Sequence, residues 1–355
     1  MKAEFSSRLQ KIEDVLNKYL PSQTNPQWQT LSFGDIDSCV SQQHIKNLLH
    51  PCKSLVDLGG KRWRPLLLLL CSELASSAKK RELAKDIEKA YALTPLVEFA
   101  HTASLIHDDI EDSADTRRGK PASHITYGLD VALNAASWLY FEATVCIKSL
   151  EIPDSEKQFL YELFLLELRR LHLGQAMDIM WHRNPDCIPS VDEYKAMVRN
   201  KTGTLSRLAV KLGVAAGGGS ESEMGAVGHF AEEIGTGFQI IDDVINLTSG
   251  NPGKKRGDDI VEGKKSLPVL LHLKKNPADI EKLVILFNQA RAEGIDSPAV
   301  EKAISLLTES GAVEEAHTLG RKIISDNSRA LSSYFGNPDS NAACLISELF
   351  AMLQK

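Results

Sequence analysis

Two segments of the chain concentrate carboxylates that could bind a divalent cation. The first is His107-Asp108-Asp109-Ile110-Glu111-Asp112, in which Asp108 and Asp112 are four residues apart and Asp109 flanks them. On a helix this spacing places both carboxylates on one face, where like charges repel each other unless a cation joins them. Clustered carboxylate oxygens suit Mg²⁺. A solvated acidic helix end would give the same pattern.

The second acidic segment repeats this arrangement. It reads Gln239-Ile240-Ile241-Asp242-Asp243-Val244-Ile245-Asn246. Apolar residues precede the Asp pair in both segments, so we expect the acids at the mouth of an apolar cavity and not on a free surface. Two such helices facing each other across a bundle would hold metal ions above that cavity. The repetition therefore favours metal binding over a solvated helix end.

Basic residues occur at complementary positions. Gly59-Gly60-Lys61-Arg62-Trp63-Arg64-Pro65 sets three cations beside two glycines, which lets backbone and guanidinium groups approach a phosphate closely. It is not a nucleotide P-loop, because Gly60-Lys61 is followed by Arg62 and not by Ser or Thr. Further cations stand in Arg117-Arg118-Gly119-Lys120, Lys201-Thr202-Gly203, Lys254-Lys255-Arg256-Gly257 and Gly263-Lys264-Lys265. Beside the acidic segments, these cations predict a ligand with an apolar tail and a diphosphate.

Helices must position these groups. Apolar residues recur at helical spacing along nearly the whole chain, and no stretch alternates convincingly as a strand does. We therefore predict an all-α protein, a single large helical bundle around a deep apolar cavity. Ser190 and Glu193 match a capping box that opens a helix carrying Lys201. Other helices are expected up to about Leu20, over Trp63–Ala78, Glu82–Asp112 with a break at Pro95, Asp130–Leu150, Ser155–Trp181 and Glu221–Leu247, with loops over Pro21–Asp35 and Ser249–Pro268.

Composition narrows the class of protein. The 355 residues include 41 Lys and Arg against 47 Asp and Glu, and this net charge of −6 argues against a nucleic-acid groove. The longest apolar run, Leu66 to Cys71, is too short to span a bilayer, and the N-terminus lacks the layout of a secretory signal. The six cysteines form no Cys-x-x-Cys pair, which is typical of reduced thiols. We expect a cytoplasmic protein with no membrane span and no nucleic-acid partner.

Taken together, the motifs resemble those of trans-isoprenyl diphosphate synthases of the polyprenyl synthetase family, in the medium- and long-chain branch that includes geranylgeranyl diphosphate synthase. The resemblance runs from about Leu58 to Pro268. Besides the segments above, it rests on Glu98-Phe99-Ala100-His101, Pro121, Gly174-Gln175 with Asp178, Phe238, and Gly253-Lys254 with Asp259. It predicts a synthase domain over residues 41–355, preceded by an N-terminal helix and loop extension over residues 1–40.

The resemblance implies head-to-tail condensation of isopentenyl diphosphate with an allylic diphosphate by a homodimer. Three Mg²⁺ ions with substrate bound would be held by Asp108, Asp112 and Asp242, with Asp109 and Asp243 in support. Residues implied in allylic diphosphate binding are Arg117, Lys201, Thr202, Gln239 and Lys254, and those implied for isopentenyl diphosphate are Lys61, Arg64, His101 and Arg118. Lys264 joins the substrate-binding residues. The departing diphosphate would take the proton, so no protein general base is required.

Two departures from the family pattern stand out. Asn246 ends the second acidic segment where many members have Asp, which removes one charge from that side. Ala136-Ser137 occupies a place where the family often has Gly-Asp. Only two residues separate the first Asp pair from Asp112, which favours the medium- and long-chain branch.

Product length depends on the depth of the cavity below the first Asp pair. Ala100, Ala103 and Ser104 stand eight, five and four residues before Asp108, and their small side chains predict a product of 20 carbons or more. Trp138 on the next helix, together with Tyr140 and Phe141, is a possible floor, which would give a product of 15 carbons.

Two other functions share part of this pattern. A class I terpene cyclase uses the same metal-triggered ionisation, but it lacks an isopentenyl site, so Lys61, Arg64 and Arg118 argue against it. A non-catalytic subunit of a heteromeric synthase usually loses an acidic segment, and this chain keeps both Asp pairs. The synthase is therefore the preferred interpretation.

Overall fold

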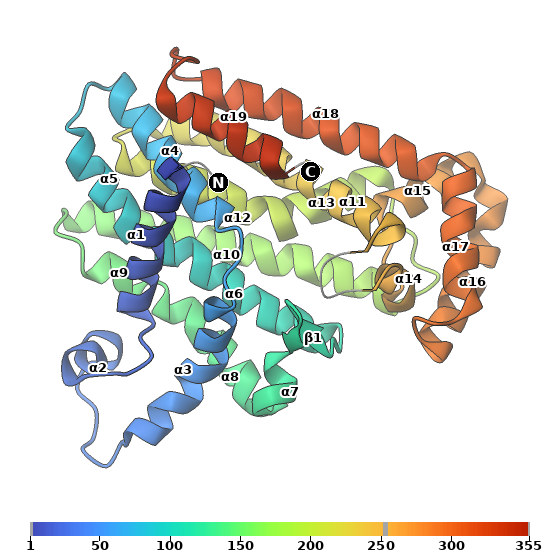
Figure 1. The fold of residues 1–355 in the computed structure, drawn as a ribbon, viewed down its shortest axis with the longest axis horizontal. Helices are drawn as coiled ribbons and strands as arrows, with labels where there is room; N and C mark the ends of the chain where they lie inside the picture. Colours follow the sequence, from blue (N-terminus) through green and yellow to red (C-terminus); the bar gives the residue numbers. More distant parts are fainter. Residues whose placement is uncertain (1–2, 251–254, 354–355) are drawn as a thin grey trace. The chain divides into compact units, whose positions relative to one another are not determined.

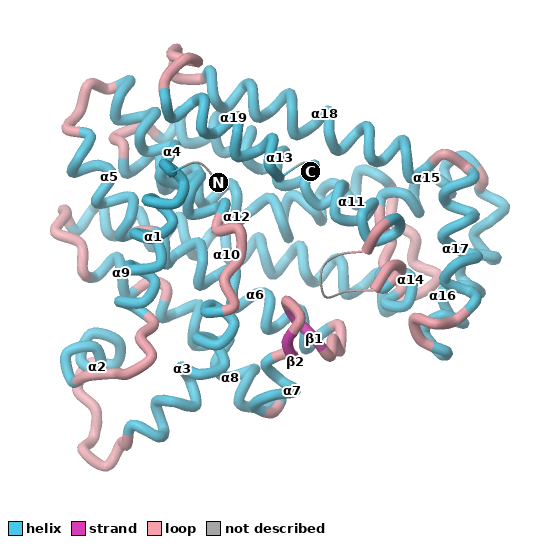
Figure 2. Tube along the Cα trace, in the orientation of Figure 1, coloured by secondary structure: helices cyan, strands magenta, loops and turns pink. Residues whose placement is uncertain are grey.

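The protein is built almost entirely of helices (Figure 1, Figure 2). Its structure, a computed structural model, describes residues 3–250 and 255–353. The strands within these residues are a two-residue antiparallel pair, β1 (Thr116–Arg117) and β2 (Lys120–Pro121). The prediction of an all-α fold is confirmed.

The chain forms two compact units. Unit 1 comprises Met1–Leu168, Arg207–Gly228 and Ser332–Ile346, and unit 2 comprises Arg169–Ser206, His229–Leu331 and Ser347–Lys355. Unit 1 contains α1 (Ala3–Tyr19), α2 (Pro26–Phe33), α3 (Gln42–Asp57), α4 (Trp63–Ala78), α5 (Leu83–Ala92), α6 (Thr94–Glu111), α7 (Ser123–Tyr127), α8 (Leu129–Glu142) and α9 (Val145–Lys148). Unit 2 contains α11 (Val191–Val198), a π-helical turn (Arg199–Gly203), α14 (Asp258–Glu262), α15 (Leu267–Lys275), a 3₁₀ turn (Pro277–Asp279), α16 (Ile280–Glu293) and α17 (Pro298–Glu309). The boundaries between the units fall inside α10 (Asp154–Arg183), α12 (Thr204–Ala216), α13 (Glu221–Thr248), α18 (Ala312–Ser333) and α19 (Asn341–Leu353).

Helix α4 forms the centre of the unit 1 core. Leu66 to Cys71 are all at most 2% exposed, as expected for a helix that is apolar on every side. The backbone of α12 lies directly against it, because a Cβ at Gly213 would stand 2.2 Å from the carbonyl oxygen of Leu68. Within residues 3–250 and 255–353, no helix is both long and apolar enough to cross a membrane.

The predicted helix boundaries hold for most of unit 1. Phe5, Ile12 and Leu16 are buried on α1, which ends just before Pro21. Pro95 stands in the first turn of α6 and separates this helix from α5, as its fixed φ and missing N–H predict. Helix α6 then packs along α8.

Two predicted loops contain helices, so those predictions are wrong in part. Helix α2 lies inside Pro21–Asp35, where the Asn25 side chain accepts a hydrogen bond from the Trp28 amide at 2.8 Å and caps the helix. Helix α14 lies inside Ser249–Pro268, of which residues 251–254 are outside the described residues. The helix expected over Asp130–Leu150 is divided into α8 and α9.

The core of unit 2 is a cluster of buried apolar residues. Most of its buried residues come from α11, α13, α15, α16 and α17, and they include Tyr194, Ile240, Leu270, Phe287 and Leu307. This core fixes the part of α13 that carries the second acidic segment.

Candidate functional site

The first acidic segment ends α6. The Asp112 amide donates to the Asp108 carbonyl at 2.8 Å, so the two residues are one helical turn apart, as their spacing predicts. Both carboxylates are partly exposed, whereas Asp109 is only 1% exposed. Asp108 and Asp112 therefore present their oxygens at one edge of unit 1, and Asp109 faces inward.

The β1–β2 hairpin brings Arg117 back to this segment. Its Nε donates to Asp109 Oδ1 at 2.7 Å, and its Nη2 lies 3.4 Å from Asp108 Oδ2. Burial alone would lower the pKa of Arg117, but the hydrogen bond and charge of Asp109 outweigh it and raise the pKa. The guanidinium thus offsets part of the charge of the acidic segment.

Arg118 occupies the turn of the hairpin and contacts the glycine motif. Its φ of 52° and the φ of 74° at Gly119 define the tight two-residue connection between the strands. Its Nη1 donates to the Gly59 carbonyl and, at 3.4 Å, to the Leu55 carbonyl. A Cβ at Gly60 would stand 3.1 Å from Arg118 Nη2, so Gly60 makes room for the guanidinium. The two basic motifs, far apart in sequence, are joined here.

Arg64 is a buried cation in unit 1. The side chain lies over the Trp63 ring at 4.5 Å, and its buried Nε has no hydrogen-bond acceptor among the described residues. Burial lowers the pKa of Arg64 to about 10, although the charge of Glu98 opposes this shift. A buried donor without an acceptor is costly, and an anionic ligand at Nε would offset that cost.

His101 stands on α6 among these cations. Loss of solvent, followed by the charges of Arg64 and Arg118, holds the pKa of the imidazole well below its usual value, so His101 is neutral at pH 7. Lys61, three residues before Arg64 in the sequence, is exposed. Arg64 and Arg118 are therefore near enough to affect the charge of His101, and a phosphate-binding role for the three residues stays a prediction.

In unit 2, Lys201 lies in the π-helical turn Arg199–Gly203. The predicted capping box is present, since Glu193 N donates to Ser190 Oγ at 3.2 Å and Ser190 N donates to the Glu193 carboxylate at 2.7 Å. The chain then widens to π geometry instead of continuing as a regular helix, a feature common at functional sites. A Cβ at Gly174 would stand 2.2 Å from the Lys201 backbone nitrogen, so the glycine in α10 permits this close approach.

Lys201 forms an ion pair with Asp178, with Nζ 2.6 Å from Oδ2. Burial would raise the pKa of Asp178, but the charges of Lys201 and Lys264 outweigh burial and lower it. Lys264 Nζ also lies 3.8 Å from Asp259 Oδ1 and pairs with Glu262. Two predicted substrate-binding lysines are thus held by carboxylates of the same unit.

A chain of hydrogen bonds leads to the second acidic segment. Thr202 Oγ1 donates to Gln239 Oε1 at 2.9 Å, and Gln239 Nε2 donates to Asp243 Oδ1 at 3.0 Å. The Tyr194 hydroxyl donates to Asp243 Oδ2 at 2.6 Å. Burial raises the pKa of Asp243, while Asp242, its neighbour on α13, is partly exposed. Sequence reasoning missed Tyr194, because no local pattern links it to a residue 49 positions later.

Asn246 has a structural role in this unit. It is 2% exposed, and its side-chain oxygen accepts a hydrogen bond from the Asp259 amide at 3.3 Å. Its carbonyl accepts from the Gly257 amide at 2.9 Å. The residue that departs from the family pattern therefore secures the start of α14. Lys254, predicted to bind substrate, lies outside the described residues.

The residues predicted to set product length divide into two groups. Ala100 and Ala103 are fully buried on α6, and Ser104 is half-buried and donates to the His101 carbonyl at 2.8 Å. Trp138 packs against Phe33 and Trp28 of α2, with ring centroids 6.2 and 6.5 Å away. Phe141 is 71% exposed and so does not floor a cavity within this chain.

The raised pKa of Glu142, which hydrogen-bonds to Ser32 of α2, predicts that the stability of the protein depends on pH. Burial raises its pKa to about 7, against the hydrogen bond from Ser32 Oγ at 2.8 Å, which favours the ionised form. The folded state therefore retains a proton that the unfolded state releases, and stability falls as the pH rises from 4.5 to 7. Glu142→Gln should remove this loss and stabilise the protein at pH 8 by about 3 kcal/mol. Denaturant titration at pH 5 and pH 8 would measure it.

The matched control is Glu151→Gln, which makes the same change at an exposed position. It should leave the pH dependence as it is. Equal pH dependence in the wild type and in Glu142→Gln would contradict the assignment of a raised pKa to Glu142.

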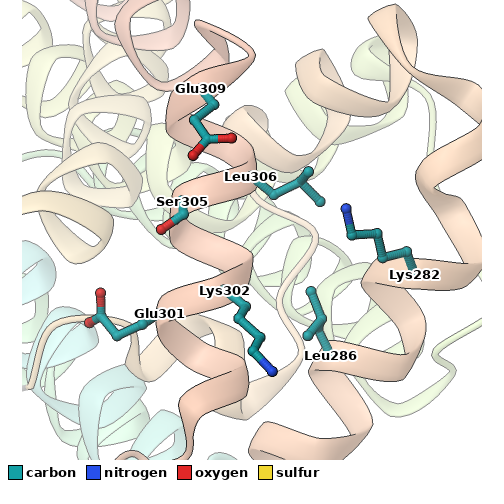
Figure 3. Close-up of a pocket in the computed structure, with 7 residues that line it drawn as sticks. All are labelled: Lys282, Leu286, Glu301, Lys302, Ser305, Leu306 and Glu309. Carbon is teal, nitrogen blue, oxygen red and sulfur yellow. The ribbon is translucent and has the colours of Figure 1, made fainter.

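A separate groove of about 350 Å³ lies between α16 and α17 (Figure 3). Leu286 and Leu306 line it, together with Lys282, Glu301, Lys302, Ser305 and Glu309. The lining includes two lysines and two glutamates, so the groove carries no excess charge. It includes none of the residues that the sequence predicts for the site, and we assign it no part in the chemistry.

Comparisons with known proteins identify a family that shares these motifs and this fold. The polyprenyl synthetase family profile matches residues 45–306. The chain is 34% identical to a geranylgeranyl pyrophosphate synthase of Gibberella zeae, over 86% of this chain and 81% of that one. It is 37% identical to a geranylgeranyl pyrophosphate synthase of Macrophomina phaseolina, over 76% and 78%. The crystal structure of geranylgeranyl pyrophosphate synthetase from Pyrococcus horikoshii superposes with a TM-score of 0.78 at 25% identity, over 99% and 97%.

The matched residues include both acidic segments and the basic motifs that the structure positions within each unit. The profile covers well over half of the chain, and the two fungal relatives exceed 30% identity over most of their length. The protein therefore belongs to the polyprenyl synthetase family, as a trans-polyprenyl diphosphate synthase that elongates prenyl chains.

Proposed function

We propose that this enzyme condenses isopentenyl diphosphate with an allylic diphosphate to give an all-trans product of 20 carbons or more. The names of the fungal relatives support geranylgeranyl diphosphate, the C20 compound, as the main product. The small side chains of Ala100 and Ala103 support a long product, because neither position carries a bulky group that would stop a growing chain.

The observation that carries the proposal is the arrangement along α6. His101, Asp108 and Asp112 are separated by seven and four residues, so they share one helical face. The cationic group around His101 and the carboxylates at the helix end are then about 10 Å apart along the axis. This supports two diphosphate sites, with isopentenyl diphosphate at Lys61, Arg64, His101 and Arg118.

As the family resemblance implies, the allylic diphosphate would be bound by Arg117, Lys201, Thr202, Gln239, Lys254 and Lys264. Lys201 and Lys264 are held by Asp178 and by Asp259 with Glu262, so their ammonium groups are already ordered in the described unit. A preorganised cation stabilises charge that develops on a leaving group without further rearrangement.

Polyprenyl synthetases use a divalent metal with their diphosphate substrates. The partly exposed carboxylates of Asp108 and Asp112 fit such a cation, and so does the donor chemistry of Asp242. We propose Mg²⁺, three ions with substrate bound, held by Asp108, Asp112 and Asp242. Asp109, which is paired with Arg117, would support them. When bound, the metal would stabilise negative charge on the diphosphate.

The proposed reaction breaks the bond between C1 of the allylic substrate and its diphosphate oxygen. The double bond of isopentenyl diphosphate then supplies the electron pair for the new carbon–carbon bond. A proton leaves the adjacent carbon to restore a double bond, and the departing diphosphate accepts it. The protein residues bind and orient the two substrates, and none acts as the base.

We also propose a homodimer. Leu129, Leu133 and Phe141 lie on one face of α8 and are 57%, 44% and 71% exposed. An apolar stripe of this kind usually marks a contact between proteins. A cytoplasmic location and the division into residues 1–40 and 41–355 stay predictions.

The test is an incubation of purified protein with Mg²⁺, isopentenyl diphosphate and one of three starters: dimethylallyl, geranyl or farnesyl diphosphate. Mass analysis of the dephosphorylated products should show growth by five-carbon units, with C20 or longer as the major product. A major product of 15 carbons would overturn the length assignment. Hydrocarbons formed without isopentenyl diphosphate would indicate a cyclase, and no elongation with any starter would indicate a non-catalytic subunit.

A further inference from the structure

Arg62 lies between two cations of the proposed isopentenyl diphosphate site, but its own side chain is bound by carboxylates. It is 4% exposed, and its Nη1 donates to Glu98 Oε1 at 2.6 Å. Its Nε donates to Glu13 Oε1 at 2.7 Å, and its Nη2 donates to the Val56 carbonyl at 2.6 Å. Glu13 belongs to α1, Val56 to α3 and Glu98 to α6. Three helices therefore hold one guanidinium.

The backbone of Arg62 explains why it must be held. The residue has φ 45° and ψ 27°, a left-handed conformation that residues other than glycine rarely adopt. It is also the N-cap of α4, so the chain turns at this point from the glycine motif into the helix. The directions in which Lys61 and Arg64 project depend on this turn.

We propose that Glu13 is a positioning residue for the isopentenyl diphosphate site. Glu13 binds Nε and Nη2 of Arg62 while Glu98 binds Nη1, and we infer that it thereby fixes the turn that directs Lys61 and Arg64 toward the substrate. This inference rests on the proposed function of those two cations. Glu13 lies outside residues 45–306, which match the family profile, so the family pattern does not assign it a role.

Charge and position predict opposite effects of Glu13. As a simple negative charge near an anion site, Glu13 would repel the diphosphate, and its removal would strengthen substrate binding. As a positioning residue, it would strengthen binding, and its removal would weaken it. The sign of the change in KM therefore separates the two roles.

The decisive variant is Glu13→Gln, which keeps the shape of the side chain but removes its charge. We expect KM for isopentenyl diphosphate to rise about tenfold, which corresponds to about 1.4 kcal/mol of lost binding. KM for the allylic substrate and kcat at saturation should change by less than about twofold. If this variant does not fold, Glu13→Asp provides the same test, because it keeps the charge but withdraws the carboxylate by one methylene.

The matched control is Glu73→Gln. Glu73 also binds α1, with its Oε1 3.0 Å from Arg8 Nε, but it lies on α4 beyond the basic motif. It should lower the thermal midpoint about as much as Glu13→Gln while leaving KM for isopentenyl diphosphate unchanged. Equal increases of KM in both variants would overturn the inference, since loose docking of α1 would then suffice. An unchanged or lower KM in Glu13→Gln would overturn it too.

Two further variants separate this inference from the proposed function. Arg64→Gln should raise KM for isopentenyl diphosphate, and if it does not, the proposed site itself is wrong. If Arg64→Gln raises KM and Glu13→Gln does not, only the role of Glu13 is wrong. In an Arg62→Met background, where Glu13 has no cation to bind at this position, Glu13→Gln should add less than about twofold, and a full tenfold rise there would contradict the mechanism.

Discussion

Asp108→Asn is expected to lower kcat for chain elongation by about a thousandfold. The substitution keeps the size of the side chain but removes a charge from the exposed edge of α6, where Asp108 and Asp112 are proposed to hold Mg²⁺. Loss of one group that stabilises developing charge typically costs two to three orders of magnitude in rate. The loss should be partly recovered at high Mg²⁺ concentration if metal affinity is the cause. Steady-state elongation rates over a range of Mg²⁺ concentrations would measure both effects.

The control for this prediction is Asp115→Asn. Asp115 is exposed a few residues after the acidic segment, and its substitution removes the same charge. It should leave kcat within about twofold of the wild type. Comparable losses in the two variants would show that net charge, and not a metal ligand at Asp108, controls the rate. A rate that Asp108→Asn leaves intact would refute the proposed metal site on α6.

The second large effect is expected at Ala103, where substitution by Phe should shorten the main product to 15 carbons or fewer. Ala103 is fully buried on α6, so a larger side chain at this position must occupy volume beside the helix. Because the proposed cavity lies below Asp108, a ring at this position would stop the growing chain early. The series Ala103→Val, Ala103→Leu and Ala103→Phe should shorten the product progressively, and chromatography of the dephosphorylated alcohols would show this.

Thr102→Phe separates a wall effect from damage to the fold. Thr102 is 3% exposed on the same helix, about 100° further round its axis. Overpacking there should reduce activity and thermal stability without shortening the product. An unchanged product distribution across the Ala103 series would eliminate Ala103 as a determinant of length.

Much of unit 1 could be predicted from the sequence because its helices carry strong local signals. The α4 boundaries, Trp63–Ala78, match the predicted ones, and Pro95 marks the start of α6 correctly. Helix α2 could not be predicted in the same way, because it has only eight residues and its apolar side chains, Trp28, Leu31 and Phe33, are too few to form a helical stripe of more than about one turn. Its contacts are tertiary, with the Trp138 ring 6.2 Å from Phe33.

The acidic and basic motifs of the site were predictable because their spacing is local. Asp108 and Asp112 need only one helical turn to share a face. The contacts that fix the basic motif could not be predicted from local patterns, because Glu13 and Arg62, which form an ion pair, are 49 residues apart. Nor does any simple pattern distinguish the π-helical turn at Lys201 from a regular helix, because that turn depends on the close approach of Gly174.

The turn at Arg118 bears on how this enzyme can be engineered for heat resistance. Arg118 is one of four described non-glycine residues with positive φ, and Arg62 is another. Holding such a residue in the left-handed region costs about 1 kcal/mol, and Asn is favoured over Arg before Gly in this kind of turn. Selection for thermostability alone would therefore enrich the substitution Arg118→Asn and discard the guanidinium that contacts the Gly59 and Leu55 carbonyls. Screens of this protein need an activity criterion, because the residue whose backbone conformation costs stability is also one proposed to bind isopentenyl diphosphate.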